Sequence, residues 1–318
     1  MPSTATTRRG AVSTDFKFLM ISAMYENGGN TTQRFLDGHP QMLVYPFESQ
    51  LGTRLVVDAL SSIFPVKYRW PVFALDAEPK DDYYAIIDEE ARVRARTPDV
   101  SKFRHVEFQM SDDERRDAYL RLVGETGRSR ADNVAAFFRA TFETWKNFER
   151  TSEQSLYVGY SPIVAVDADK ILAELPNAHV LHVVRNPWSA YAETKRRPVP
   201  LSLDHYMLGW TLNQQFALRL QAEHPSRFHI LRFEDLVAGP RKALGEVCRK
   251  IGCDDSESLG VTSWNGMPLG EVFPWGTIRK ATPEANRETA LTLSEAERSD
   301  VRARAALYLD ALDYSRLP

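Results

Sequence analysis

The chain has 318 residues, of which 43% are hydrophobic and 26% are charged, and its formal net charge is −3. This composition is ordinary for a soluble globular protein. The slight negative charge excludes a general electrostatic attraction to nucleic acid or to anionic membranes, so any anion site must be local. Two cysteines, Cys248 and Cys253, cannot form a disulfide framework, and no further Cys or His cluster nearby completes a zinc site. A reducing compartment fits this cysteine usage best.

Residues 1–14 are rich in Ser, Thr and Arg and lack the apolar stretch of a secretory signal. We expect this segment to be a disordered N-terminal arm. No window of the sequence approaches the roughly 18 apolar residues of a membrane span. Because the sequence contains no repeat, no low-complexity tract and no clear linker, we predict that residues 15–318 form a single domain.

An apolar run at residues 16–23 predicts a buried strand, and the loop Asn27-Gly28-Gly29-Asn30-Thr31-Thr32 follows it. Asn30 or Thr31 can cap a helix that runs to about residue 38, because His39-Pro40 then ends it. A short strand is predicted at 43–45, and a helix is predicted after Glu48, through Leu51, Leu55 and Val56. From 80 to 150, charged residues dominate and aromatic residues recur at helical spacing, which predicts helices packed over one side of a sheet.

Further strands are predicted at 156–159, 180–184 and 228–231, with a helix at 169–175 between the first two. Asp204 can cap a long helix in which leucine or phenylalanine recurs every fourth residue up to 220. The last two helices are predicted at 240–251 and at 294–312, where Ser294 and Glu297 form a capping box. Alternating strands and helices indicate an α/β fold with a mostly parallel sheet and right-handed crossovers.

The loop after the first strand is a natural anion site, since backbone N–H groups at a helix N-terminus point at the ligand and the helix dipole adds partial positive charge. No Gly-Lys-Ser/Thr follows Gly28 or Gly29, so the Walker A motif is absent and a phosphotransferase that uses ATP is disfavoured. The alternative is a glycine turn that binds no ligand.

Together with its surroundings, this loop resembles the sulfotransferases that use 3′-phosphoadenosine 5′-phosphosulfate (PAPS). The resemblance is carried by the loop and by three other segments, Phe35-Leu36-Asp37-Gly38-His39-Pro40, Ser161-Pro162 and His182-Val183-Val184-Arg185-Asn186-Pro187. It covers roughly residues 16–60 and 155–315. It implies a three-layer α/β/α fold with a P-loop-NTPase-like sulfotransferase core, PAPS as the donor co-substrate, and no metal.

The resemblance also implies roles for single residues. The loop residues Asn27, Gly28, Gly29, Asn30, Thr31 and Thr32 would cradle the 5′-phosphosulfate. Arg185 would hold the 3′-phosphate, which suits a guanidinium because it can grip phosphate with two parallel hydrogen bonds. Glu193 stands where the family has a serine, and Ser189 or Thr194 would replace that contact. Arg279 would reach a phosphate and Trp275 would stack, from a loop that closes over the nucleotide.

Two cationic positions of the family are lost in this chain. Glu26 stands in the basic slot of the loop, and Tyr160 replaces a lysine two residues before Pro162. The missing charge has two candidate sources. One is Arg34, one helical turn beyond the loop, as a catalytic residue. The other is the run Lys195-Arg196-Arg197, which could equally be a solvated surface run.

Glu48 lies where family members that sulfate sugars or protein tyrosine often carry a catalytic glutamate. Sulfuryl transfer to a hydroxyl needs a base that removes the proton, and a carboxylate just past a strand end is well placed for this. A structural role for Glu48, as a cap or as the partner of an arginine, is the alternative.

The expected function is therefore transfer of a sulfuryl group from PAPS to a hydroxyl of a sugar or small-molecule acceptor, with no nucleic-acid partner. Residues 80–150, with Trp70, Tyr83, Tyr84 and Trp145, would shape the acceptor pocket. The alternative is a catalytically silent relative that binds a nucleotide or a partner, which the losses at Glu26 and Tyr160 motivate. Family members of the secretory pathway usually carry a membrane anchor, so its absence implies a cytoplasmic enzyme.

Overall fold

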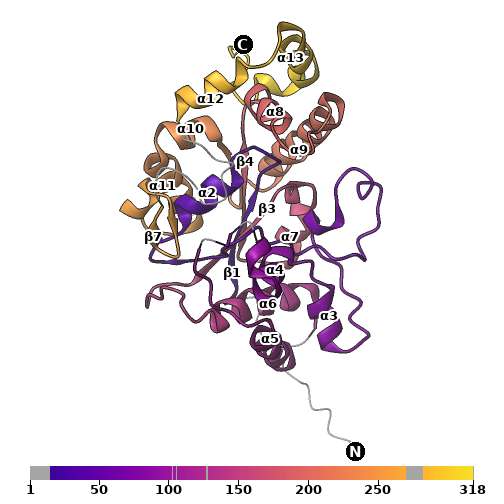
Figure 1. The fold of residues 1–318 in the computed structure, drawn as a ribbon, viewed down its shortest axis with the longest axis vertical. Helices are drawn as coiled ribbons and strands as arrows, with labels where there is room; N and C mark the ends of the chain where they lie inside the picture. Colours follow the sequence, from indigo (N-terminus) through magenta and orange to yellow (C-terminus); the bar gives the residue numbers. More distant parts are fainter. Residues whose placement is uncertain (1–14, 102, 105, 127, 270–281, 318) are drawn as a thin grey trace, which may run out of the picture.

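A parallel five-stranded sheet is the centre of the molecule (Figure 1). The computed structural model describes residues 15–101, 103–104, 106–126, 128–269 and 282–317. The strands are β1 (Lys17–Ser22), β2 (Met42–Val44), β3 (Leu156–Ser161), β4 (Ala178–Val184) and β5 (Phe228–Arg232). Their order is β2-β3-β1-β4-β5, and every neighbouring pair is parallel. The predicted N-terminal arm at 1–14, Trp275 and Arg279 lie outside the described residues.

Helices connect the strands and cover the sheet. Those in the first half are α2 (Gly29–Leu36), α3 (Pro79–Ala85), α4 (Glu89–Arg96), α5 (Asp112–Thr126) and α6 (Arg130–Thr144). Those in the second half are α7 (Ala168–Glu174), α8 (Pro187–Lys195), α9 (Leu203–Glu223), α10 (Phe233–Ala238), α11 (Pro240–Ile251), α12 (Pro283–Ala290) and α13 (Glu295–Leu309). Across the described ranges, no helix is both long and apolar enough to cross a bilayer.

Alternation along β1 builds the layers. Successive side chains of a strand point to opposite faces, so Leu19 and Ile21 pack under one set of helices and Phe18 and Met20 under another. The first face is covered by α2, α10 and α11, and the second by α6, α7 and α9 (Figure 1). The predicted three-layer α/β/α architecture with a parallel sheet is therefore confirmed.

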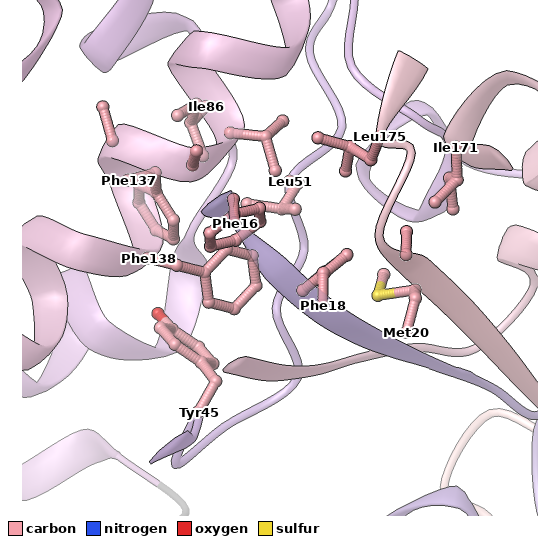
Figure 2. Packing of buried hydrophobic residues seen from close by; sticks show 14 of the residues in the cluster. Phe16, Phe18, Met20, Tyr45, Leu51, Ile86, Phe137, Phe138, Ile171 and Leu175 are labelled. Atoms are coloured by element: carbon pink, nitrogen blue, oxygen red, sulfur yellow. The ribbon is translucent and has the colours of Figure 1, made fainter. Parts of the chain in front are cut away.

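Aromatic residues fill the core on the second face (Figure 2). The Phe138 ring of α6 lies 4.9 Å from the Phe18 ring and 6.2 Å from the Phe16 ring, measured between centroids. Tyr45, just after β2, meets Phe138 edge-on at 5.7 Å. Its hydroxyl donates to Asp88, which pairs with the buried Arg115 of α5. The helices of residues 80–150 are thus fixed to the sheet by aromatic packing and by a buried charge network.

The predicted helix after Glu48 is wrong. Residues 49–63 form turns, bends and one isolated bridge between Thr53 and Ile86. Backbone and side-chain groups here bond to distant parts of the chain: Ile87 N–H donates to the Gly52 carbonyl at 3.0 Å, and the Thr53 hydroxyl donates to the Val72 carbonyl at 2.5 Å. These tertiary bonds take up groups that a helix would have to pair internally, so helical propensity is overridden.

Two helix starts also differ from the predicted ones. Helix α2 begins at Gly29 with Gly28 as its N-cap, so Asn30 and Thr31 lie in its first turn and do not cap it. Helix α9 is capped by Ser202, whose hydroxyl accepts from the His205 N–H. Asp204 instead pairs with Arg304 of α13. The predicted capping box of Ser294 and Glu297 is confirmed.

Burial of histidine makes the fold sensitive to acid. His182 of β4 is fully buried, and among the described residues only its Nε2 has a hydrogen-bond partner, the Gln214 side chain at 3.0 Å. Burial lowers the pKa of His182 from 6.5 to about 4. Protonation therefore favours the unfolded chain, and the stability contributed by the neutral ring is present above pH 6.5 and lost as the pH falls toward 4.

We expect wild-type protein to lose roughly 2 kcal/mol of unfolding free energy between pH 7 and pH 5 through His182 alone. Urea unfolding of wild type and of His182→Gln at both pH values measures this change. The loss should shrink in the variant and stay as in wild type in His205→Gln, which alters an exposed histidine of α9. Equal pH dependence in wild type and His182→Gln would contradict the assignment.

Candidate functional site

The candidate site lies where the central strands end. Parallel register places Ser22, the last residue of β1, beside Ser161 of β3 and His182 of β4. The β1–α2 loop (residues 23–28) and Arg185, the first residue after β4, consequently meet at one edge of the sheet. In open α/β sheets the carboxyl ends of the strands form the ligand-binding edge.

Asn27 joins the β1–α2 loop to the end of β4. Its Oδ1 accepts from the Arg185 backbone N–H at 2.9 Å. Its Nδ2 donates to the Tyr25 carbonyl at 2.9 Å and to the Tyr206 hydroxyl at 3.1 Å. Asn27 thereby fixes the loop relative to Arg185, while its predicted contact with a ligand stays a prediction.

Gly28 and Gly29 are demanded by the close approach of two aromatic rings. Gly28 has φ 95°, in the left-handed region, and a Cβ at this position would stand 2.2 Å from the Phe233 ring. A Cβ on Gly29 would stand 2.2 Å from the Tyr160 ring. Both distances are far below van der Waals contact, so no larger residue fits without movement of the rings. The glycine pair thus has a packing reason of its own, beside any role in binding.

The first turn of α2 follows these glycines. A helix leaves its first N–H groups without intrahelical acceptors, so those of Gly29, Asn30 and Thr31 are available to an anion. Thr31 and Thr32 are buried, and the Thr32 hydroxyl donates to the Gly28 carbonyl at 3.0 Å. Asn30 is partly exposed. The backbone of this turn fits an anionic ligand, and the predicted side-chain contacts remain predictions.

Arg185 is only 8% exposed and lies among polar groups of distant segments. Its Nε donates to Asn286 Oδ1 at 2.5 Å, and one of its Nη atoms donates to the Glu26 carbonyl at 3.1 Å. The guanidinium carbon stands 5.0 Å from the centroid of the Phe233 ring. Burial lowers the pKa of Arg185, and the neighbouring carboxylates, Glu193 first among them, oppose this shift.

Helix α12 meets Arg185 through a buried polar network. The Ser189 hydroxyl donates to the Asn286 carbonyl at 2.7 Å, and Asn286 Nδ2 donates to Glu234 at 2.9 Å. Glu234 also accepts from Asn186 at 2.7 Å and from the Tyr314 hydroxyl at 2.7 Å. Sequence reasoning missed Asn286, which is 101 positions from Arg185 and belongs to no motif. Glu234 lies in the segment Arg232-Phe233-Glu234-Asp235-Leu236 at the end of β5.

Glu193, which we predicted to stand in the position of the family serine, is a paired carboxylate. Glu193 accepts from the Thr289 hydroxyl at 3.3 Å and pairs with Arg196 at 3.1 Å. The Thr194 hydroxyl donates to the Ala190 carbonyl within α8. Of the two predicted replacements, Ser189 is the one that joins the network around Arg185.

Carboxylates surround the β1–α2 loop. Glu26 has φ 60°, an uncommon left-handed conformation for a residue other than glycine. Burial raises the pKa of Glu26; Glu193 and Glu48 raise it further, and Arg197 and Arg185 lower it. Two contacts join this region: Arg197 pairs with the Glu26 carboxylate at 3.8 Å, and Arg185 donates to the Glu26 carbonyl at 3.1 Å.

Two tyrosine residues, Tyr160 and Tyr25, belong to the candidate site. Tyr160, which we predicted to replace a family lysine, is buried against Gly29, and burial, with Glu48 and Glu26 nearby, raises its pKa well above the usual range. Burial raises the pKa of Tyr25 to about 12, although the positive charge of Arg197 acts against it. Both hydroxyls are therefore neutral at physiological pH, and neither replaces the missing positive charge.

Glu48 follows β2 and is partly exposed at this edge. Gln50 Nε2 donates to its Oε2 at 3.1 Å, and its charge acts on Tyr25, Glu26 and Tyr160. The structure therefore brings Glu48 to the β1–α2 loop, and its predicted role as a base stays a prediction.

Arg34 is engaged elsewhere. Its side chain is buried, donates to the Pro46 carbonyl at 3.3 Å and lies over Trp264, 5.1 Å from the ring centroid. The predicted catalytic role of Arg34 remains a prediction.

Three of the aromatic residues expected around the acceptor, Trp70, Tyr83 and Trp145, are fully buried in the core. Their packing is incompatible with lining an open pocket, whereas Tyr84 is exposed.

A model of the sulfotransferase family matches residues 28–257 of the chain. No relative is found among curated proteins. The match spans well over half of the 318 residues and includes the turn at Gly28, the strand end at Arg185 and the Glu234 segment.

Solved sulfotransferase domains share the fold. The domain from the olefin synthase of Synechococcus PCC 7002 is 18% identical, with a TM-score of 0.54 and coverage of 92% of this chain and 94% of that one. The domain from the curacin biosynthetic pathway is 15% identical, with a TM-score of 0.56 and coverage of 95% and 99%. At such identities the likeness concerns the fold alone. The family match and the P-loop-like α/β fold together show that the chain belongs to the sulfotransferase family.

Proposed function

We propose that this protein transfers a sulfuryl group from PAPS to a hydroxyl of a small-molecule or carbohydrate acceptor. The observation that carries the proposal is the junction of the β1–α2 loop with Arg185, made by the 2.9 Å bond from the Arg185 N–H to Asn27. This junction sets an anion-binding helix N-terminus beside a buried guanidinium, within a chain of the sulfotransferase family. The donor would supply the activated sulfuryl group and a nucleotide moiety that the protein can bind.

Two parts of the edge would hold the donor. The N–H groups of Gly29, Asn30 and Thr31 would bind the 5′-phosphosulfate, with Asn27 and Thr32 shaping the turn through their own hydrogen bonds. Arg185 would hold the 3′-phosphate, with Ser189 beside it. Asn286 Oδ1 now accepts from Arg185 Nε, so we infer that the 3′-phosphate takes over this hydrogen bond. The predicted contact of Arg279 remains part of the proposal.

Transfer would break the bond between sulfur and the bridging oxygen of the 5′-phosphate and form a bond between sulfur and the acceptor oxygen. The acceptor proton would pass to the Glu48 carboxylate, and the bridging oxygen would keep the electron pair as 3′,5′-ADP (PAP) leaves. Glu48 suits the role of base because it stands at the edge beside the β1–α2 loop and is partly exposed.

A catalytically silent relative is the second candidate. It is favoured by the three carboxylates, Glu26, Glu48 and Glu193, that share the site with Arg185. Each carboxylate repels an anionic donor, and the Tyr160 ring holds the place of a cation. Under this candidate the edge would bind nucleotide or a partner without turnover.

Nucleotide binding separates these possibilities. We expect PAP at about 100 times its dissociation constant to stabilise the protein by roughly 2.7 kcal/mol, a shift of a few degrees in thermal unfolding, whereas 5′-AMP and ATP stabilise less. Arg185→Lys should remove most of this shift because a lysine cannot make the bidentate contact. Arg232→Lys, at the end of the neighbouring strand β5, is the matched control and should respond as wild type does. No response of wild type to PAP would contradict the proposed donor.

Glu48→Gln tests the base. The amide keeps the shape of the side chain and cannot accept the proton, so release of PAP from PAPS in the presence of hydroxyl acceptors should fall roughly 10²- to 10⁴-fold. Stabilisation by PAP in thermal unfolding should persist and shows that the site is intact. Turnover at the wild-type rate would remove Glu48 from this role, and wild-type protein that binds PAP without any turnover would favour the silent relative.

A further inference from the structure

Sulfuryl transfer develops negative charge on the departing bridging oxygen, and a positive group beside that oxygen lowers the barrier. In this chain Glu26 occupies the basic slot of the β1–α2 loop, and Tyr160 is a buried, neutral residue at the strand end. Arg185 already donates to Asn286 and to the Glu26 carbonyl, and we assigned it to the 3′-phosphate. Among the described residues, we therefore looked for a cation for the 5′-phosphosulfate in another segment.

The basic run at the end of α8 divides in three directions. Consecutive residues at a helix end project about 100° apart, so three neighbours cannot face one target. Lys195 pairs with Glu297 of α13 at 2.5 Å, and Arg196 pairs with Glu193 at 3.1 Å. Arg197 is the member of the run that turns to the β1–α2 loop.

Two contacts place Arg197 at the loop. Its Nε stands 3.8 Å from Glu26 Oε1, and its guanidinium carbon lies 5.3 Å from the centroid of the Tyr25 ring. The backbone supports this direction, because the Arg197 N–H donates to the Thr194 carbonyl at 3.2 Å and Pro198 follows. Arg197 thus leaves the end of α8 across the two residues that precede Asn27 and Gly28.

We propose that Arg197 is the cation that binds the 5′-phosphosulfate end of the donor, and that Glu26 holds it beside the loop until the donor arrives. This rests on the proposed sulfotransferase function. During transfer the sulfur–oxygen bond to the 5′-phosphate breaks, its electron pair stays on the phosphate oxygen, and Arg197 offsets the charge that develops there. Arg197 would then be a catalytic residue supplied by the α8–α9 connection in place of the β1–α2 loop.

The contact with Glu26 is loose enough to exchange. A distance of 3.8 Å exceeds that of a hydrogen bond, and within the described part of the chain no group accepts a hydrogen bond from the Arg197 guanidinium. The side chain is 40% exposed, and ion pairs at such exposure contribute little to stability. All five donors of the guanidinium therefore remain available for phosphate or sulfuryl oxygens. Arg34, by contrast, is buried against Pro46 and Trp264.

Two nucleotides that differ only at the 5′ position test this assignment without knowledge of the acceptor. PAP carries 3′- and 5′-phosphates, whereas adenosine 3′-monophosphate carries only the 3′-phosphate. We expect Arg197→Ala to weaken PAP binding roughly ten- to hundredfold and to leave binding of adenosine 3′-monophosphate unchanged, in isothermal titration. Lys195→Ala, which removes a charge from the same run, is the matched control and should bind both nucleotides as wild type does.

The outcomes separate the two proposals. Wild-type protein that binds neither nucleotide overturns the donor site and, with it, the role of Arg197. Wild-type protein that binds both, with the PAP affinity of Arg197→Ala unchanged, overturns Arg197 alone. Equal weakening of both nucleotides in Arg197→Ala would also overturn it, because the effect would then not belong to the 5′ end.

Two further variants test the transfer step and the holding carboxylate. With an acceptor that wild type uses, Arg197→Ala should lower kcat roughly 10²- to 10³-fold, and Arg197→Lys should recover part of this loss. Glu26→Gln removes the carboxylate that competes with the donor, so PAP should bind severalfold more tightly. Weaker PAP binding in Glu26→Gln would contradict the proposal that Glu26 holds Arg197 beside the loop until the donor binds.

Discussion

The burial of Arg185 organises the whole carboxyl edge of the sheet. A guanidinium that is 8% exposed must be satisfied by protein groups or by a ligand, since an unpaired buried charge is costly. Asn286 of α12 and the Glu26 carbonyl provide its acceptors, and Phe233 provides the surface beneath it. Segments separated by more than a hundred positions are drawn together by this one requirement. Glu234 extends the polar network around Arg185, because its carboxylate accepts hydrogen bonds from Asn186, Asn286 and Tyr314.

The polar network also holds Arg185 and the β1–α2 loop in place through protein groups. The acceptor of Arg185 Nε is an amide oxygen, which carries no net charge, and under our proposal a phosphate oxygen would replace it. A carboxylate in that place would compete more strongly with the ligand. The β1–α2 loop is also held by protein groups. The Asn27 side chain forms hydrogen bonds with Arg185, Tyr25 and Tyr206 and thereby fixes the loop backbone. Preorganised groups of this kind reduce the ordering cost of binding.

Local pattern was sufficient for the sheet and its edge. Apolar runs ending in polar residues located β1, β4 and β5, and the glycine turn indicated that a helix follows β1, although α2 begins at Gly29 and not at the predicted residue. The prediction failed where tertiary hydrogen bonds determine the local structure. Thr53 bonds to the Val72 carbonyl and forms a bridge with Ile86, so the expected helix after Glu48 does not form. Asn286 could not be found, because no periodicity or motif relates it to Arg185. The direction in which each residue of the run at 195–197 points was equally hidden, because it depends on the register of the last turn of α8.

The contact between Gly29 and Tyr160 has a consequence for how such chains can diverge. Because the ring occupies the space into which a side chain at position 29 would extend, the two positions are sterically coupled across the sheet. A lysine at position 160 in place of tyrosine would open that space and also supply a cation. Substitutions at 29 and 160 should therefore appear jointly among homologues of this chain, and relatives with an aromatic residue at 160 should keep glycine at 29. The aromatic residue at 160 and the glycine at 29 therefore constrain each other sterically.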